Sequence, residues 1–244
     1  MRIAALQKHP IKGIGWEAVS ATTFTAGAPF PGDRAWAIAH ERAPDRDGWM
    51  PKAAFLQVMA GPELAAIRVE SQGDRISLSH PDRPQRRFSL PEDGPDLIDW
   101  LRPLWPEGKP APVRLVRAPE EGMPDNGKAT VHVLLQETLD ALSKAAGQPV
   151  DAARFRPNIV LAGLPAWSEL DWVGRRVLVG GAEIRVLERT GRCRATDANP
   201  ESGERDVEML DLLKRAIGHT DVGVYAQVIR GGHVSLGDGA ELIP

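Results

Sequence analysis

The sequence has little cysteine and no long apolar run. Its 244 residues contain one cysteine, Cys193. A single thiol cannot close an internal disulfide, a four-cysteine zinc site or an iron–sulfur cluster that the chain holds alone. No window approaches about 18 uninterrupted apolar residues, and the N-terminus lacks the apolar core of a signal peptide. We therefore expect no membrane span and a cytoplasmic protein.

A basic excess is also absent. Lysine and arginine number 30 against 33 aspartates and glutamates, a formal net charge of −3. Proteins that bind nucleic acid polymers usually carry a basic excess, so none is expected as a partner. With 42% hydrophobic and 26% charged residues, the composition excludes wholesale disorder, collagen and coiled coil. The length fits one large or two small domains.

Several catalytic signatures are missing. The six histidines are scattered, without a His-x-x-x-His pair or a carboxylate-rich loop, which argues against a zinc or calcium site. The sequence has no phosphate-binding Gly-x-x-x-x-Gly-Lys loop and no Gly-x-Gly-x-x-Gly dinucleotide fingerprint. It also lacks the Gly-x-Ser-x-Gly elbow of serine hydrolases.

What is present indicates many short elements, more β than α, because 24 glycines and 21 prolines are spread along the chain. Alternating apolar residues predict strands at 65–69, 76–79 and 222–228, and a hairpin at 176–188 around Gly180-Gly181. Helical spacing and glycine stops predict helices at 135–146 and 207–217, and a short helix is expected at 94–105. The polar stretch 117–128 is the candidate junction between two halves. The expected fold class is mixed α/β, mostly β.

Cys193 is the first candidate for chemistry. Arg192 and Arg194 flank it, and adjacent cations favour the thiolate, the form that attacks or binds a metal. The alternative is a small buried hydrophobe, because free cysteines are often buried. Composition does not decide between the two interpretations.

Four further residues follow or sit among turn formers. Arg156 and Asn158 precede the apolar run 159–162, where they could hold an anion and a polar ring, or be a solvated arginine and a turn asparagine. Lys12 and Arg34 also follow turn residues. Each alone is a weak indication, since a surface cation usually has no specific role.

Taken in order, these segments resemble the two-part MOSC proteins. Phe155-Arg-Pro-Asn-Ile-Val160 is the same as the family's run, and Gly191-Arg-Cys193 with its following loop is similar to the family's cysteine segment. More moderate similarities lie at both ends of the chain: His9-Pro-Ile-Lys12, Gly32-Asp-Arg-Ala-Trp36, Gly223-Val-Tyr225 and Val234-x-x-Gly-Asp238.

The resemblance implies an N-terminal MOSC-type β-barrel domain over residues 1–118 and a C-terminal MOSC β-barrel domain with peripheral helices over residues 119–244. It implies a molybdenum cofactor, Mo-molybdopterin, with the Cys193 thiolate as metal ligand and catalytic residue. The soft thiolate suits molybdenum. The other cofactor-binding positions that it implies are Lys12, Arg34, Lys52, Thr130, Arg156, Asn158 and Arg192.

Some of these matches are loose. Thr130 lies near a family Thr-Ser-Pro stretch and Lys52 near a family arginine. Gly13 stands where the family usually has serine, so a side-chain contact from that position is absent. Larger bacterial members continue into a cysteine-rich ferredoxin domain, and one cysteine cannot hold such a cluster.

The leading hypothesis is a molybdenum-dependent reductase of N-hydroxylated small molecules: hydroxylamines, N-hydroxy bases or amidoximes. It needs no pyridoxal phosphate, and a separate redox protein supplies the electrons. No proton donor stands out; for Asp197 and His219 a loop cap and a surface histidine are the favoured interpretations. One alternative is a cofactor-binding or sulfur-carrier protein without turnover. Another is a metal-free Cys193 hydrolase or transferase, which lacks an evident general base.

Overall fold

The structure is a computed structural model, and it describes residues 1–120, 122–125 and 127–243. Its strands are β1 Arg2–Lys8, β2 Glu17–Val19, β3 Ala21–Phe24, β4 Trp36–His40, β5 Arg68–Gln72, β6 Arg75–His80, β7 Arg83–Ser89, β8 Pro112–Arg117, β9 Val131–Leu135, β10 Ile159–Ala162, β11 Arg176–Val179, β12 Ala182–Gly191, β13 Asp221–Arg230, β14 Gly232–Ser235 and β15 Ala240–Ile243. Its α-helices are α1 Gly94–Leu101, α2 Gln136–Ala146 and α3 Met209–Ile217. Short 3-10 helices are η1 Lys52–Ala54, η2 Pro62–Ala66, η3 Arg102–Leu104, η4 Ala152–Phe155, η5 Ser168–Asp171 and η6 Arg194–Asp197.

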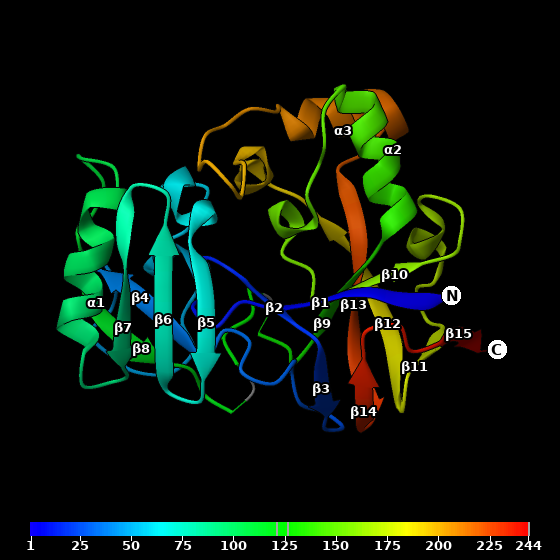
Figure 1. Cartoon of the computed structure of the whole chain (residues 1–244), viewed down its shortest axis with the longest axis horizontal. Coiled ribbons are helices and arrows are strands. Elements are labelled where there is room, and N and C mark those ends of the chain that lie inside the picture. Colours follow the sequence, from blue (N-terminus) through cyan, green and yellow to red (C-terminus); the bar gives the residue numbers. More distant parts are fainter. Residues whose placement is uncertain (121, 126, 244) are drawn as a thin grey trace.

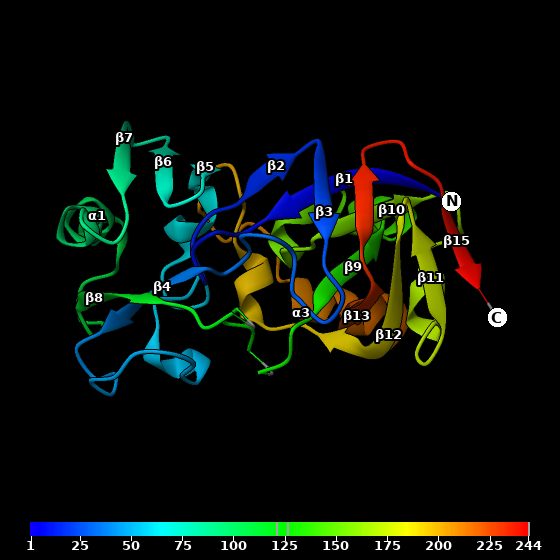
Figure 2. The ribbon, with the colours of Figure 1, turned by 90° about the horizontal axis from the view of Figure 1, so that it is seen from below.

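The elements form two lobes that lie side by side in both views (Figures 1 and 2). The first lobe holds β4 to β8 and α1. The second lobe holds β1 to β3, β9 to β15, α2 and α3. This architecture is the mixed α/β, mostly β fold that the glycine and proline distribution predicts.

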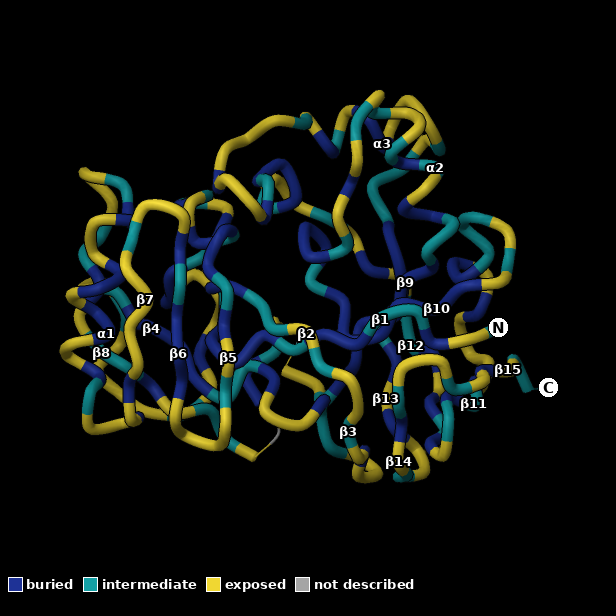
Figure 3. The backbone as a smooth tube through the Cα atoms, in the orientation of Figure 1, coloured by how far each residue is buried: buried dark blue, intermediate teal, exposed yellow. Residues whose placement is uncertain are grey.

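An eight-stranded sheet organises the second lobe, in the order β15-β11-β12-β13-β9-β10-β1-β2. Only β9 and β10 pair in parallel, and α2 connects them, as a parallel pair requires a crossover. The predicted hairpin is β11 and β12, which pair in register across Gly180-Gly181. Apolar side chains of these strands form one core, and the tube in Figure 3 is buried along β9.

The first lobe packs α1 and the β4–β8 pair behind the three-stranded sheet β5-β6-β7. Its own core includes Ile38, Leu78, Phe88 and Leu101. The predicted strand at 65–69 begins later than expected. Residues 62–66 form η2, because Pro62 fixes the φ angle of a tight turn, and β5 begins at Arg68.

The helices α2 and α3 stop where the sequence predicts, whereas α1 ends at Leu101 and is followed by η3. Gly147 ends α2 with a φ of 70°, and Gly218 ends α3 with a φ of 79°, conformations that glycine adopts without steric cost. Leu139 and Leu142 of α2 pack with Leu213 of α3 in a third core cluster. None of the described helices is long and apolar enough to cross a membrane.

The strands β1 to β3 join the second lobe, whereas Ile11 and Ile14 between β1 and β2 pack in the core of the first lobe. β1 pairs with β10, and β3 pairs with β14. The chain then crosses to the first lobe and returns after β8 (Figure 1). The division between residues 118 and 119 into two domains stays a prediction, and the strand pairing shows that both halves of the chain build the larger sheet.

Candidate functional site

A pocket between the lobes brings together every residue that the sequence comparison assigned to the site. Lys12, Arg34 and Lys52 come from the first half of the chain, and Thr130, Arg156, Asn158, Arg192 and Cys193 come from the second half. Other residues that line the same pocket were not assigned to the site from the sequence, including Asp33, Gln57, Val58, Asp125, Phe155 and Tyr225. Residues far apart in sequence therefore converge on one place.

Cys193 lies at the end of β12, where the chain turns into η6, and its side chain is exposed. The interpretation as a small buried hydrophobe is therefore wrong. The Cys193 carbonyl accepts hydrogen bonds from the Thr196 backbone N–H at 3.1 Å and from Thr196 Oγ1 at 2.9 Å, which fixes the turn. None of the histidines that the structure describes lines the pocket, so the metal-free hydrolase lacks an imidazole base there.

The two arginines beside Cys193 have different surroundings. Arg192 lines the pocket, donates to the Phe155 carbonyl at 2.7 Å, and its guanidinium lies over the Phe155 ring. Its Nε atom is buried without a hydrogen-bond partner. Arg194 instead pairs with Asp197 at 3.0 Å, outside the pocket. Of these two arginines, Arg192 is therefore the one placed to contact a group bound beside the thiol.

Arg156 is held in the pocket by the backbone of the opposite wall. It adopts a left-handed conformation with a φ of 52°, and its guanidinium donates to the Gly15 carbonyl at 2.8 Å and to the Ile11 carbonyl at 3.4 Å. Burial, with the neighbouring charge of Arg34, lowers the pKa of Arg156 to about 9. A bound anion would oppose both effects, because a nearby negative charge favours the protonated guanidinium.

Asn158 lines the same wall, but its amide is already bonded. Its Oδ1 accepts from the His132 backbone N–H at 3.0 Å, and its Nδ2 donates to the Gln7 carbonyl at 3.3 Å. It is almost fully buried. Both bonds reach segments distant in the sequence, so the amide shapes the wall and is not the local turn asparagine of the alternative interpretation.

Lys12 and Arg34 are cations buried beside carboxylates. Lys12 Nζ donates to the Met123 carbonyl at 2.8 Å and pairs with Asp125. Burial lowers the pKa of Lys12, and Asp125 offsets part of that effect. Arg34 pairs with Asp33; burial alone would lower the pKa of Arg34, but Asp33 together with Tyr225 and Asp125 outweighs it and raises the pKa.

Asp33 joins Arg34 to a buried histidine. Its Oδ1 accepts from the His9 backbone N–H at 2.7 Å and from His9 Nδ1 at 3.0 Å. Burial alone would raise the pKa of Asp33, but Arg34 and His9 outweigh it and hold the pKa below its usual range. Burial also lowers the pKa of His9 to about 3, so His9 is neutral at physiological pH.

The loosely matched residues also reach the pocket. Lys52 lies at the rim, with Nζ 3.9 Å from an Asp125 carboxylate oxygen, and Thr130 is buried in the lining. Gly13, where the family usually has serine, has a φ of 70°, and a Cβ there would lie 2.3 Å from the Leu56 carbonyl oxygen. Leu56 therefore excludes any side chain at position 13 in this backbone.

Asp197 and His219 both lie outside the pocket, in keeping with a loop cap and a surface histidine. Asp197 Oδ1 accepts from the Met209 N–H at 3.1 Å at the start of α3, and it does not line the pocket.

Tyr225 of β13 lines the pocket, with its ring 5.5 Å from the His132 ring. In the sequence, only its place in the motif Gly223-Val-Tyr225 pointed to Tyr225 as a site residue. The fold shows that its side chain faces the pocket.

The pocket carries more positive than negative charge. Five cations line it against two carboxylates, Asp33 and Asp125. The unpartnered Nε of Arg192 and the lowered pKa of Arg156 both indicate donors that lack an anionic partner. This donor set, beside an exposed thiol, fits a phosphorylated, sulfur-containing anion such as molybdopterin.

Comparisons with known proteins point to one family. The profile of the MOSC domain matches residues 117–241. The chain is similar to mitochondrial amidoxime-reducing component 1 of Xenopus laevis, 42% identical over 84 residues that make up 34% of this chain and 24% of that protein. It is also similar to the Danio rerio component 1, 23% identical over 178 residues, 58% of this chain and 54% of that protein.

The match thus spans about a quarter to a half of the length of these relatives. Among solved structures, the YuaD protein of Bacillus subtilis aligns with 99% of this chain and 94% of its own. Its TM-score is 0.48 at 12% identity.

Proposed function

This chain belongs to the MOSC domain family, and from that premise we propose that it binds Mo-molybdopterin between its lobes and reduces N-hydroxylated small molecules. The observation that carries the proposal is the exposed Cys193 thiol in a pocket lined by five cations. A thiolate is a soft ligand that suits molybdenum, and cations suit a phosphate.

When bound, the molybdenum centre supplies two-electron oxygen-atom chemistry. The chain's own residues hold and orient the group. Lys12, Arg34 and Arg156 are the proposed partners of the phosphate, and Arg192 contacts the cofactor beside the thiolate. Asn158 would shape the wall beside the pterin, and Thr130 and Lys52 line the same pocket.

The substrate class rests on the relatives. Proteins named amidoxime-reducing components match 34% to 58% of the chain, which supports N-hydroxylated substrates. Tyr225 is the hydroxyl-bearing side chain proposed to hold a polar substrate near Cys193, because it lines the same pocket. A separate redox protein is the proposed electron donor, since the single cysteine leaves no cluster in this chain to store electrons.

The test is made on protein purified from a molybdopterin-producing host. We expect about one molybdenum and one pterin per chain, and loss of an N-hydroxy substrate when a one-electron dye or a redox protein is added. NADH alone should give no turnover. Turnover with NADH alone would remove the partner requirement, and equal turnover by cofactor-free protein would remove the molybdenum proposal.

A second candidate is favoured by the same exposed thiol. Cys193 can be reached from solvent, as a sulfur carrier requires. A carrier would hold the cofactor or a persulfide on Cys193 without turnover. Mass spectrometry of the intact protein separates the two: a persulfide on Cys193 in protein that has no reductase activity with any donor supports the carrier.

A further inference from the structure

The loop after Cys193 is closed upon itself. Residues 198–206 begin and end at a bridge between Ala198 and Arg205. Inside it, the Asn199 N–H donates to the Glu204 carbonyl at 2.7 Å, and the Gly203 N–H donates to the Asn199 carbonyl at 2.8 Å. These bonds make the loop a compact unit, so a displacement of its tip also moves its base.

The base of this loop is anchored in the second lobe. Arg154 donates through Nη2 to both carboxylate oxygens of Asp206, at 2.6 and 2.8 Å, and through Nη1 to the Asp197 carbonyl at 3.1 Å. Arg154 is itself buried. Because η6 is the only segment between Cys193 and the loop, this anchor also fixes the chain that carries Cys193 and Ala195.

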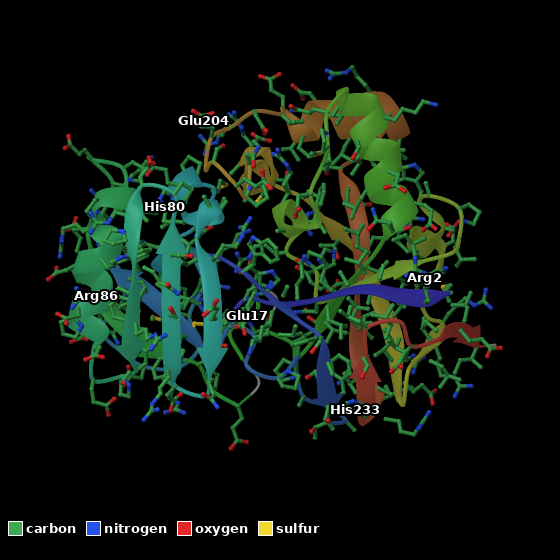
Figure 4. All side chains as sticks on the ribbon, in the orientation of Figure 1. Arg2, Glu17, His80, Arg86, Glu204 and His233 are labelled. Atoms are coloured by element: carbon green, nitrogen blue, oxygen red, sulfur yellow. The ribbon has the colours of Figure 1, made fainter. Side chains whose placement is uncertain are left out.

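The tip of the loop rests on the first lobe. Gly203 is buried with a φ of 76°, and a Cβ there would lie 2.6 Å from Glu63 Cα. Arg205 Nη2 donates to the Met59 carbonyl at 2.5 Å, and Arg68 Nη1 donates to the Pro200 carbonyl at 2.6 Å. In Figure 4 the loop, marked by Glu204, spans from one lobe to the other.

The Met59 contact lies beside the pocket. Met59 directly follows Gln57 and Val58, which line the pocket from the first lobe. We propose that the loop 198–206 is a latch that holds this wall against the wall carrying Cys193, with Gly203 and Arg205 as its positioning residues. The latch sets how often the two walls separate, and therefore how fast a bound group leaves.

Gly203→Ala tests the latch, and Gly108→Ala is its matched control. Gly108 has a φ of 77°, nearly that of Gly203, but no atom within 4 Å of the place its Cβ would take. Both variants carry the same backbone strain, and only Gly203→Ala pushes against the first lobe. Arg205→Gln is a second test that leaves the backbone unchanged.

The first measurement is hydrogen–deuterium exchange of the purified chain without any added ligand. Gly203→Ala and Arg205→Gln should speed exchange about three- to tenfold at residues 55–64 and at 193–206, the change that loss of one tertiary contact produces. Gly108→Ala should leave both segments at the wild-type rate. Faster exchange confined to 198–206, or none beyond the control, overturns the latch.

The second measurement follows release of pterin from loaded protein by its fluorescence, far below the melting temperature. Both latch variants should release pterin about three- to tenfold faster than the control, in proportion to wall opening. Equal release rates overturn the claim about residence time. Absence of pterin from the wild type would contradict the proposed function, and the exchange experiment would still decide the latch.

Discussion

His132 and Asn158 hold each other by two hydrogen bonds. The His132 N–H donates to Asn158 Oδ1 at 3.0 Å, and the Asn158 N–H donates to the His132 carbonyl at 2.8 Å. The pair lies where the parallel strands β9 and β10 begin, directly after the turn that carries Arg156. A side chain in a family motif therefore acts on the backbone that presents the pocket.

Asn158→Ala should destabilise the cofactor-free protein. The substitution leaves the buried His132 N–H without an acceptor, which costs about 1–3 kcal/mol of unfolding free energy. Urea denaturation of the cofactor-free chain measures it. If stability is unchanged while pterin retention falls, the amide serves the cofactor and not the wall.

Arg156→Ala should weaken retention of the cofactor more than it lowers the melting temperature. A charge-assisted hydrogen bond to a phosphate or pterin oxygen is worth about 1.5–3 kcal/mol, or about 10- to 100-fold in affinity. Gel filtration followed by pterin analysis measures retention. Arg194→Ala is the control, because Arg194 lies outside the pocket. Full retention with early unfolding would make Arg156 structural.

Cys193→Ser should abolish reductase activity and leave the melting temperature close to that of the wild type. The side chain is exposed, so the substitution removes little packing, whereas a hydroxyl is a poor substitute for a soft thiolate. Turnover with a one-electron dye is compared at equal pterin content. Comparable turnover by the serine variant removes Cys193 from the ligand role.

Stability should fall in acid through His9. Burial lowers its pKa from 6.5 to about 3, so below pH 6.5 the unfolded chain takes up a proton that the folded chain does not. The contribution of His9 to the unfolding free energy is therefore constant above pH 6.5. It decreases toward pH 3 by up to about 1.4 kcal/mol per pH unit, the value for one proton. Burial lowers the pKa of His132 well below its ordinary value, which adds to the same trend.

His9→Gln should reduce the slope of unfolding free energy against pH by the contribution of one proton. Urea denaturation between about pH 7 and pH 4, which covers one histidine titration, measures the slope. His233→Gln, at an exposed position labelled in Figure 4, is the control and should keep the wild-type slope. An unchanged slope in His9→Gln would show that His9 is charged in the folded protein.

Much of the local structure follows from the sequence. Gly147 and Gly218 end their helices because glycine adopts positive φ without steric cost, and Gly180 turns the hairpin for the same reason. Period-two alternation predicts the central strands, since residues two apart face the same side of a sheet. The exception is η2, where Pro62 and buried apolar residues favour a 3-10 helix over the predicted strand.

The sequence by itself determined the helices, the hairpin, the family resemblance and the candidate site residues, because these depend on neighbouring positions. Only the tertiary structure decided that β1 joins the sheet of the second lobe, that Cys193 is exposed, and that Asp33, Asp125 and Tyr225 enter the pocket. It also decided that the Asn158 amide binds backbone. Those outcomes depend on which distant segments pack together, and packing is a property of the whole chain rather than of any window in it.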